Sequence, residues 1–245
     1  MGGILDVPFG LATSVGPLPC VDPHEAVQMA LASQPTFPSA PTLGVTEGSL
    51  LAQAVAGVPG VEVLPPGLLR VASGLCEPAP DEGVELMPVG LDGDAWAAVR
   101  SFLGHLAAPP PLGVRVTILG PVSLALGLRA AGVPTGRALA IATHLVAERA
   151  HAVLTAVRDA MPGGVVMVCA AEPGLVGAVH PTFPLAPDQI RAALTPLVGE
   201  RTTGRIVKVQ PVAGRPVEAV MTLTGIDPAG DGGLLDLVLS PTYAQ

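Results

Sequence analysis

The residue best placed to do chemistry is Glu172. It closely follows the all-apolar run 165–169 (VVMVC), which is typical of a buried strand. Enzymes with α/β barrels place their reacting groups at the carboxyl ends of the strands. A carboxylate at such a position can bind a substrate amine or act as a general base. It can equally cap the loop that follows, and its position in the sequence leaves both interpretations open.

Histidines and cysteines do not form a metal-ligand pattern. The chain has five histidines and three cysteines, with no CxxC or HExxH spacing, and it has no Walker loop, GxGxxG or GxSxG motif. His144 and His151 fall on one predicted helix, where partly exposed surface positions are favoured over a metal pair. Cys169 lies inside an apolar run and is expected to be a buried small apolar side chain.

Composition favours one well-packed domain over residues 1–245. The hydrophobic fraction is 49%, charged residues make up 13%, and the formal net charge is −8. A disordered chain has the opposite balance of hydrophobicity and charge. Twelve basic residues against twenty acidic ones, with six aromatic residues, also exclude a basic nucleic-acid groove or a set of base-stacking platforms.

The N-terminal sequence and the apolar stretches of the chain indicate the expected compartment. The start MGGILDVPFG lacks the basic and long apolar regions of a secretory signal. The apolar stretch 112–128 is interrupted by Arg115 and Pro121, which makes it a poor membrane span. We therefore expect a cytoplasmic protein with reduced thiols and no membrane partner.

Short apolar runs alternate with helical periodicity along the chain. Strands are predicted at 114–119, 165–169, 206–209 and 235–239, and helices at 23–33, 48–56, 135–161, 187–197 and 217–223. Strands that are apolar on both faces and separated by helices indicate a parallel sheet covered by helices. Residues 57–92 are rich in Gly and Pro, and a β-hairpin or a piece of barrel wall fits them.

Four segments form an ordered set of motifs. They are 10–23 (GLATSVGPLPCVDP), 47–61 (EGSLLAQAVAGVPGV), 116–132 (VTILGPVSLALGLRAAG) and 171–175 (AEPGL). In this order, over about residues 10–200, they resemble the catalytic domain of the cobalamin-independent methionine synthase family. The resemblance implies a (β/α)8 TIM barrel of the methionine synthase/uroporphyrinogen decarboxylase type.

The resemblance also implies a reaction and a set of site residues. The family transfers a methyl group from a methyltetrahydrofolate to the thiol of homocysteine, and a zinc ion lowers the pKa of that thiol. By resemblance, Thr13, Ser14, Gly120, Ser123 and Glu172 would bind an amino-acid or folate type of substrate, and Glu172 would also be catalytic.

This chain departs from the family pattern at several of its functional positions. Pro17 stands where the family has a turn serine, and Ala171 replaces an aspartate beside Glu172. The positions expected to carry zinc ligands hold Lys208, Gln210 and Ser240. Because zinc needs about four N, S or O ligands, we expect no bound zinc and no other cofactor.

The end of the chain leads to a prediction about assembly. The sequence stops at Gln245, before the family's eighth strand, so the barrel is expected to be incomplete at its C-terminal end. An unpaired parallel edge invites pairing with another chain. We therefore expect a homo-oligomer, or a complex with a related barrel, that covers the strand at 235–239.

Two functions stay open at this point. One is methyl transfer as in the methionine synthase family. The other is a zinc-free, non-catalytic homologue that acts as a binding protein or as a partner subunit. A uroporphyrinogen-decarboxylase-like enzyme ranks last, because Arg70, Arg100 and Arg115 are not arranged recognisably for a tetrapyrrole.

Overall fold

The computed structural model describes residues 13–14, 16–77, 89–106, 109–178, 180–198, 204–208 and 218–223. In chain order the described elements are α1 (Pro23–Ser33), η1 (Thr46–Gly48), α2 (Leu50–Val55), β1 (Val61–Leu64), β2 (Leu68–Val71), α3 (Ser73–Cys76), η2 (Asp94–Trp96), α4 (Ala97–Gly104), β3 (Gly113–Leu119), α5 (Pro121–Ala130), α6 (Thr135–Ala160), β4 (Val165–Ala171), η3 (Pro173–Gly177), α7 (Pro187–Val198), β5 (Gly204–Lys208) and β6 (Glu218–Leu223). Here η marks a short 3-10 helix.

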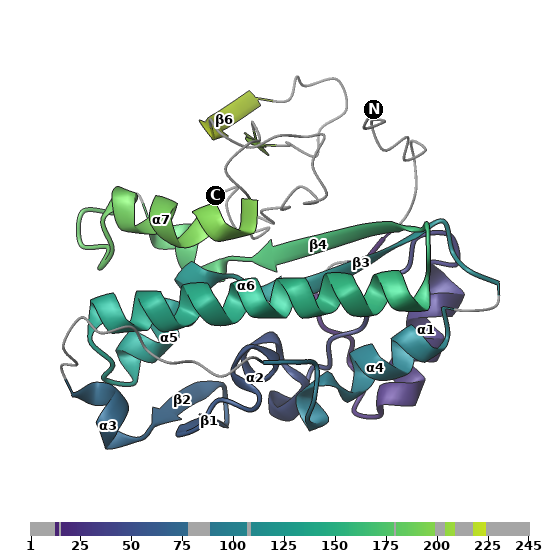
Figure 1. Ribbon diagram of the computed structural model, residues 1–245, viewed down its shortest axis with the longest axis horizontal. Helices are drawn as coiled ribbons and strands as arrows, with labels where there is room; N and C mark the ends of the chain where they lie inside the picture. The colour runs from purple at the N-terminus through teal and green to yellow at the C-terminus, as the bar shows by residue number, and fades with distance from the viewer. Residues whose placement is uncertain are drawn as a thin grey trace.

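A parallel strand pair, β3 and β4, organises the described part of the molecule. The pair runs in register from Gly113 opposite Val165 to Leu119 opposite Ala171. Both strands are rich in valine, which suits a pleated surface buried on its faces. The chain passes from one strand to the other through α5 and α6, and α6 runs alongside the pair (Figure 1).

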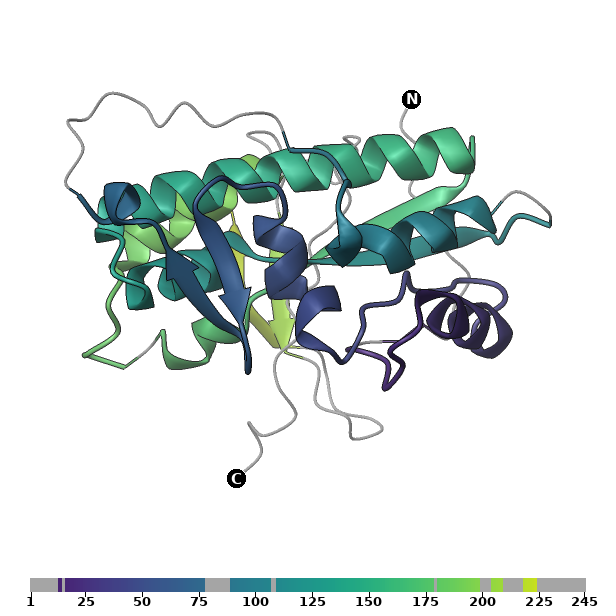
Figure 2. The same cartoon turned by 90° about the horizontal axis from the view of Figure 1, so that it is seen from below.

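The main core lies between this strand pair and the helices that cover it. Alternate β3 residues, Val114, Val116 and Ile118, enter the core and are at most 3% exposed. The helix α6 faces them with a buried stripe at three- and four-residue spacing: Ala138, Ile141, Ala142, Leu145, Val146, Arg149, Val153 and Val157. Burying each large aliphatic side chain contributes about 1.5–3 kcal/mol. The stripe therefore fixes how α6 sits on the strand pair. Figure 2 shows α6 from a second side.

Further parallel bridges lie upstream of β3 in the chain. Leu18 bridges Leu43, and Ser39 bridges Arg115, both in parallel. The segments near 18, near 39–43, β3 and β4 are thus each paired with the next one along the chain. A TIM barrel pairs its consecutive strands in this way. The eight-stranded barrel itself stays a prediction, and residues 235–239 lie outside the described residues.

Two antiparallel pairs complete the described strands. The pair β1–β2 aligns Val61 with Val71, so a β-hairpin does occupy part of the Gly- and Pro-rich region. The pair β5–β6 aligns Gly204 with Leu223. The helix predicted at 217–223 was wrong, because this stretch is the strand β6. Over seven residues, apolar spacing cannot separate helix from strand, and the partner strand β5 decides the outcome.

The helix boundaries follow local capping signals in some places and not in others. At α1, Asp22 is the N-cap and accepts a hydrogen bond from the His24 backbone N–H at 2.8 Å, as its sequence position indicates. Thr135, expected to cap the long helix, is its first residue, while the N-cap is Pro134.

Within the described residues, no helix combines the length and apolar character needed to cross a membrane.

Candidate functional site

Glu172 lies immediately after β4, and its carboxylate is buried against the beginning of α5. Glu172 is only 5% exposed. One oxygen, Oε1, accepts from the backbone N–H of Val122 at 2.8 Å. The other, Oε2, accepts from the backbone N–H of Ser123 at 2.7 Å and from its hydroxyl at 2.6 Å. The carboxylate is therefore held by three donors, all from the first turn of α5.

The beginning of α5 explains why a carboxylate is placed there. The first N–H groups of a helix have no partner within the helix, and the helix dipole makes this end partly positive. The N-cap of α5 is Gly120, which has no side chain to accept these hydrogen bonds. Glu172 supplies the missing acceptor from the neighbouring strand. It thus caps α5 through space rather than along the chain.

Ser123 extends this contact to the segment that follows β4. Its hydroxyl donates to Glu172 and also accepts from the backbone N–H of Gly174 at 2.9 Å. Gly174 belongs to η3, which starts one residue after Glu172. The hydroxyl therefore ties the turn after β4 to the first turn of α5.

Gly120 provides the space that the Glu172 side chain occupies. A Cβ atom at position 120 would lie 2.2 Å from Cδ and 2.3 Å from Oε1 of Glu172. The backbone N–H of Gly120 donates to the carbonyl of Ala171 at 2.8 Å, which continues the β3–β4 pairing by one step. No side chain fits here while Glu172 keeps this position.

The electrostatics of the site combine opposing effects. Burial raises the pKa of the Glu172 carboxyl above its ordinary value. Hydrogen bonds from the Ser123 side chain and from the Val122 and Ser123 backbones act in the opposite direction. A carboxylate has about four lone-pair positions, and three of them are used here. In this position the Glu172 carboxylate accepts hydrogen bonds from α5 and does not face a substrate.

The structure brings three of the predicted substrate-binding residues together, as described above: Gly120, Ser123 and Glu172. Ser14 has other partners: its backbone N–H donates to Gln34 Oε1 at 2.9 Å, and its carbonyl accepts from Arg115 Nη1 at 2.9 Å. The guanidinium of Arg115 also reaches Cys169, three residues before Glu172.

The remaining sequence-predicted residues do not join this cluster. Thr13 is exposed and adjoins Ser14. Cys169 is buried, as expected, and accepts from the Arg115 Nε–H at 3.1 Å. Of the proposed zinc-ligand positions, Lys208 lies in β5, while Gln210 and Ser240 lie outside the described residues.

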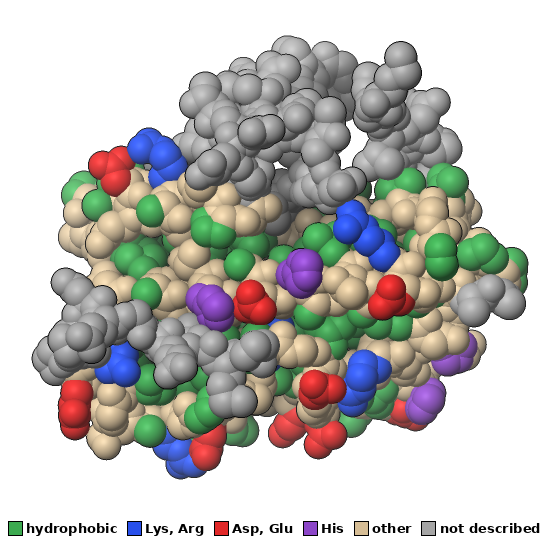
Figure 3. Space-filling model, in the orientation of Figure 1, with side chains coloured by type: hydrophobic (Ala, Val, Ile, Leu, Met, Phe, Trp, Pro, Cys, Tyr) green, Lys and Arg blue, Asp and Glu red, His purple; other side chains and the backbone are tan. Residues whose placement is uncertain are grey.

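The described residues offer no alternative metal centre. They contain no group of three or more His, Cys, Asp or Glu side chains that could hold a metal ion. His144 and His151 are both exposed on α6. On the face drawn in Figure 3, charged and histidine side chains are scattered rather than gathered into a patch of one sign.

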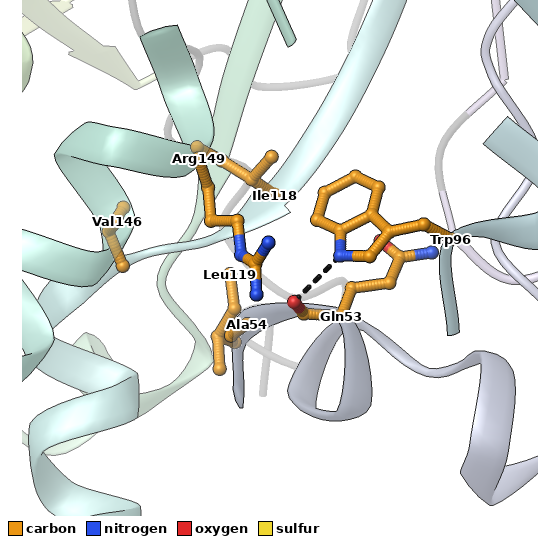
Figure 4. Close-up of a pocket in the computed structure, with 7 residues that line it drawn as sticks. All are labelled: Gln53, Ala54, Trp96, Ile118, Leu119, Val146 and Arg149. Atoms are coloured by element: carbon orange, nitrogen blue, oxygen red, sulfur yellow. Dashed lines mark hydrogen bonds between the residues drawn. The ribbon is translucent and has the colours of Figure 1, made fainter. Parts of the chain in front are cut away.

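A second polar cluster was missed by the sequence interpretation. Arg149 is 2% exposed, and its guanidinium lies over the ring of Trp96, 5.5 Å from the ring centroid, with Gln53 close by (Figure 4). Burial lowers the pKa of Arg149 to about 10, an effect that the charge of Asp92 opposes. The sequence carries one signal that could have identified Arg149, namely its position on the apolar stripe of α6, between Leu145 and Val153.

Comparisons with known proteins add no relative. The chain matches no protein-family model, no curated protein and no solved structure. The resemblance to methionine synthases therefore remains a hypothesis that the sequence motifs carry.

Proposed function

We propose that this chain is a methionine-synthase-like barrel protein that acts without zinc in the cytoplasm. In this proposal it binds a small molecule of the amino-acid or folate type, or serves as the partner subunit of a related barrel. The observation that carries the proposal is the placement of Glu172. The strongest catalytic candidate in the sequence is engaged as a helix cap.

The hydrogen bonds of Glu172 explain why capping competes with catalysis. A general base must reach the proton that it removes, within about 2.6–3.2 Å or through one water. The Glu172 carboxylate is 5% exposed and spends both oxygens on Val122 and Ser123. Turning it toward a substrate would leave the first N–H groups of α5 without partners, which costs about 1–3 kcal/mol for each buried group.

The succession of parallel pairs supports the barrel part of the proposal. Leu18 with Leu43, Ser39 with Arg115, and β3 with β4 follow one another in chain order. In a barrel of this type the turn after β4 would lie at the ligand-binding end. The turn that contains Glu172 and Gly174 would then shape a binding site without itself reacting.

Methyl transfer as in the family remains the second candidate. The observation that favours it is the raised pKa of Glu172, since carboxyl groups with raised pKa values are frequent in active sites. A raised pKa also results from burial in a structural contact. The two candidates therefore have to be separated by experiment.

The test uses the purified full-length protein incubated with zinc sulfate. Methyl transfer from methyltetrahydrofolate to homocysteine is followed by thiol consumption, and bound zinc is measured on the same sample. Homocysteine, methionine and methyltetrahydrofolate are titrated separately by calorimetry, and the protein is also mixed with a complete methionine synthase and chromatographed. We expect no turnover above the protein-free control, together with binding of one small molecule or co-elution with the related barrel. Turnover with stoichiometric zinc, or the absence of any binding, would overturn the proposal.

A further inference from the structure

The chain forms a β-turn at residues 180–183, between η3 and α7. The sequence of this turn is His180, Pro181, Thr182 and Phe183. The backbone N–H of Phe183 donates to the carbonyl of His180 at 2.9 Å, which closes the turn. Proline at the second position sets the backbone angle that common β-turns need there. The turn therefore forms from its own residues, and it is independent of the function proposed above.

The imidazole of His180 closes the same turn a second time. Its Nδ1 atom accepts from the backbone N–H of Thr182 at 3.2 Å and lies 2.8 Å from the Thr182 hydroxyl oxygen. Aspartate and asparagine often act in this way from the first position of a turn, where a side-chain oxygen accepts from the N–H two residues on. Here a ring nitrogen takes the place of that oxygen, and a ring nitrogen can gain a proton.

The contact with Thr182 fixes the form of the imidazole, because a backbone N–H is always a donor. Nδ1 must carry a lone pair, so the proton of the neutral ring is on Nε2. In the imidazolium form both ring nitrogens are donors. The Nδ1–H would then face the Thr182 N–H, which would lose its acceptor. The Thr182 hydroxyl can turn and accept from the imidazolium, so protonation removes the backbone contact alone.

The charged side chains of the neighbouring elements have other partners. Glu172 is bound by the first turn of α5. Asp188 and Arg191 pair with each other on α7 at 2.8 Å. Arg129, in the last turn of α5, donates to the side-chain hydroxyl at the start of α6, and η3 carries no ionisable side chain. Among the described residues, the hydrogen-bonding partner of the imidazole is therefore Thr182.

The surroundings of the turn allow the ring to change its charge. His180 and Thr182 are exposed, so water can solvate an imidazolium that moves away from the backbone. Phe183 is half-buried and packs against the apolar cluster that contains Val122 and Leu185. The turn thus joins an ionisable surface group to an apolar side chain that is anchored on α5 and α7.

We propose that neutral His180 closes the turn at 180–183 and that protonation of its ring releases the Thr182 N–H. The direction of the effect follows from the hydrogen bond. Only the neutral ring can accept from the backbone at Nδ1, so the closed turn favours the neutral form. The turn is therefore tightest at high pH and loosens as the pH falls and the ring takes up a proton.

Nuclear magnetic resonance on the isotope-labelled full-length protein tests this proposal. Spectra are recorded from about pH 8 to about pH 5, the range in which histidine side chains change charge. At the upper end, the ring nitrogen shifts should show an unprotonated Nδ1. As the pH falls, the Thr182 amide should exchange with water about fivefold faster than in His180→Asn at the same pH, the factor for one net hydrogen bond. A proton on Nδ1 at the upper end, or equal exchange rates throughout, would overturn the proposal.

Two variants separate His180 from the other ionisable groups. In His180→Asn the amide oxygen can still accept from the N–H two residues on, and it does not titrate, so the Thr182 amide shift should be independent of pH. His144→Asn, at an exposed position on α6, is the matched control and should keep the native titration. The opposite result in either variant would assign the titration to another group and contradict the proposal.

The native protein decides by itself if His180→Asn fails to fold. The Thr182 amide shift and the His180 ring shifts should then follow the same titration curve. An amide shift that does not follow the ring would overturn the proposal.

Discussion

The β4–α5 junction and the α2–α6 interface each bury one ionisable side chain. The two regions differ in how completely they hydrogen-bond that side chain. At the junction, Glu172 accepts three hydrogen bonds from α5. At the interface, Arg149 has one carbonyl, an aromatic ring and a cavity around it. Glu172 lies beside a helix end that needs an acceptor, whereas Arg149 projects from the middle of a helix whose backbone is already paired.

This difference separates two roles for a buried charge. A fully hydrogen-bonded charge fixes the position of the elements that satisfy it, and removing it leaves several donors unpaired. A poorly compensated charge is costly to bury, and an apolar side chain of similar size often replaces it without loss. We infer that the Glu172 junction sets how α5 lies on β4, while the Arg149 interface depends mainly on packing.

The largest expected effect comes from removing the space at Gly120. In Gly120→Ala, the new Cβ would lie within 2.5 Å of Cδ, Oε1 and Cγ of Glu172, so the carboxylate must leave α5. We expect the free energy of unfolding in urea to fall by about 3 kcal/mol, through overpacking and lost hydrogen bonds. The control Gly136→Ala, where no atom lies within 4 Å of the new Cβ, should be neutral or slightly stabilising. Equal effects of the two substitutions would contradict this explanation.

A smaller loss is expected when the Glu172 carboxylate becomes an amide. In Glu172→Gln, one side-chain NH2 faces a backbone N–H of α5, so a buried donor loses its acceptor. The free energy of unfolding should fall by about 2 kcal/mol, as measured by chemical denaturation. Glu47→Gln, at an exposed position, serves as the control and should change it by less than about 0.5 kcal/mol. A variant as stable as the native protein would show that the cap is dispensable.

Arg149→Met should have a weaker effect despite the deeper burial of the side chain. The substitution breaks the hydrogen bond to the Ala56 carbonyl and removes a buried charge, and these two changes oppose each other. We expect the unfolding free energy to change by less than about 1 kcal/mol. The comparison of the two regions fails if this variant loses as much stability as Glu172→Gln.

The smallest expected effect is a dependence on pH. Because burial raises the folded-state pKa of Glu172, the folded chain holds this proton more tightly than the unfolded chain does. The resulting stability is fully present below the ordinary pKa of glutamate and is lost as the pH rises through the raised value. The difference in unfolding free energy between the native protein and Glu172→Gln should therefore shrink over that range. A difference that grows with pH would mean that the hydrogen bonds outweigh burial.

Local signals in the sequence predicted several elements well. The helix at 23–33 has the predicted ends, because Asp22 and Pro23 define its first turn by themselves. The strands predicted at 114–119 and 165–169 extend by one residue at the start of β3 and by two at the end of β4. These runs are apolar enough to be recognised without their partners.

Contacts between distant parts of the chain were beyond sequence reasoning. The carboxylate of Glu172 reaches Val122, fifty residues earlier, so its role as a cap depends on the β3–β4 pairing. The sequence left capping and catalysis open for this reason. The strand at 218–223 likewise depends on its pairing with β5.

The central claim is that Glu172 and Ser123 act together to hold α5 on β4. A double-mutant cycle of Glu172→Gln and Ser123→Ala, measured by urea unfolding at neutral pH, tests it most directly. Because the Ser123 hydroxyl lies 2.6 Å from Oε2 of Glu172, the two substitutions should be non-additive, with a coupling energy of about 1 kcal/mol. Additive effects, with a coupling energy near zero, would contradict the account.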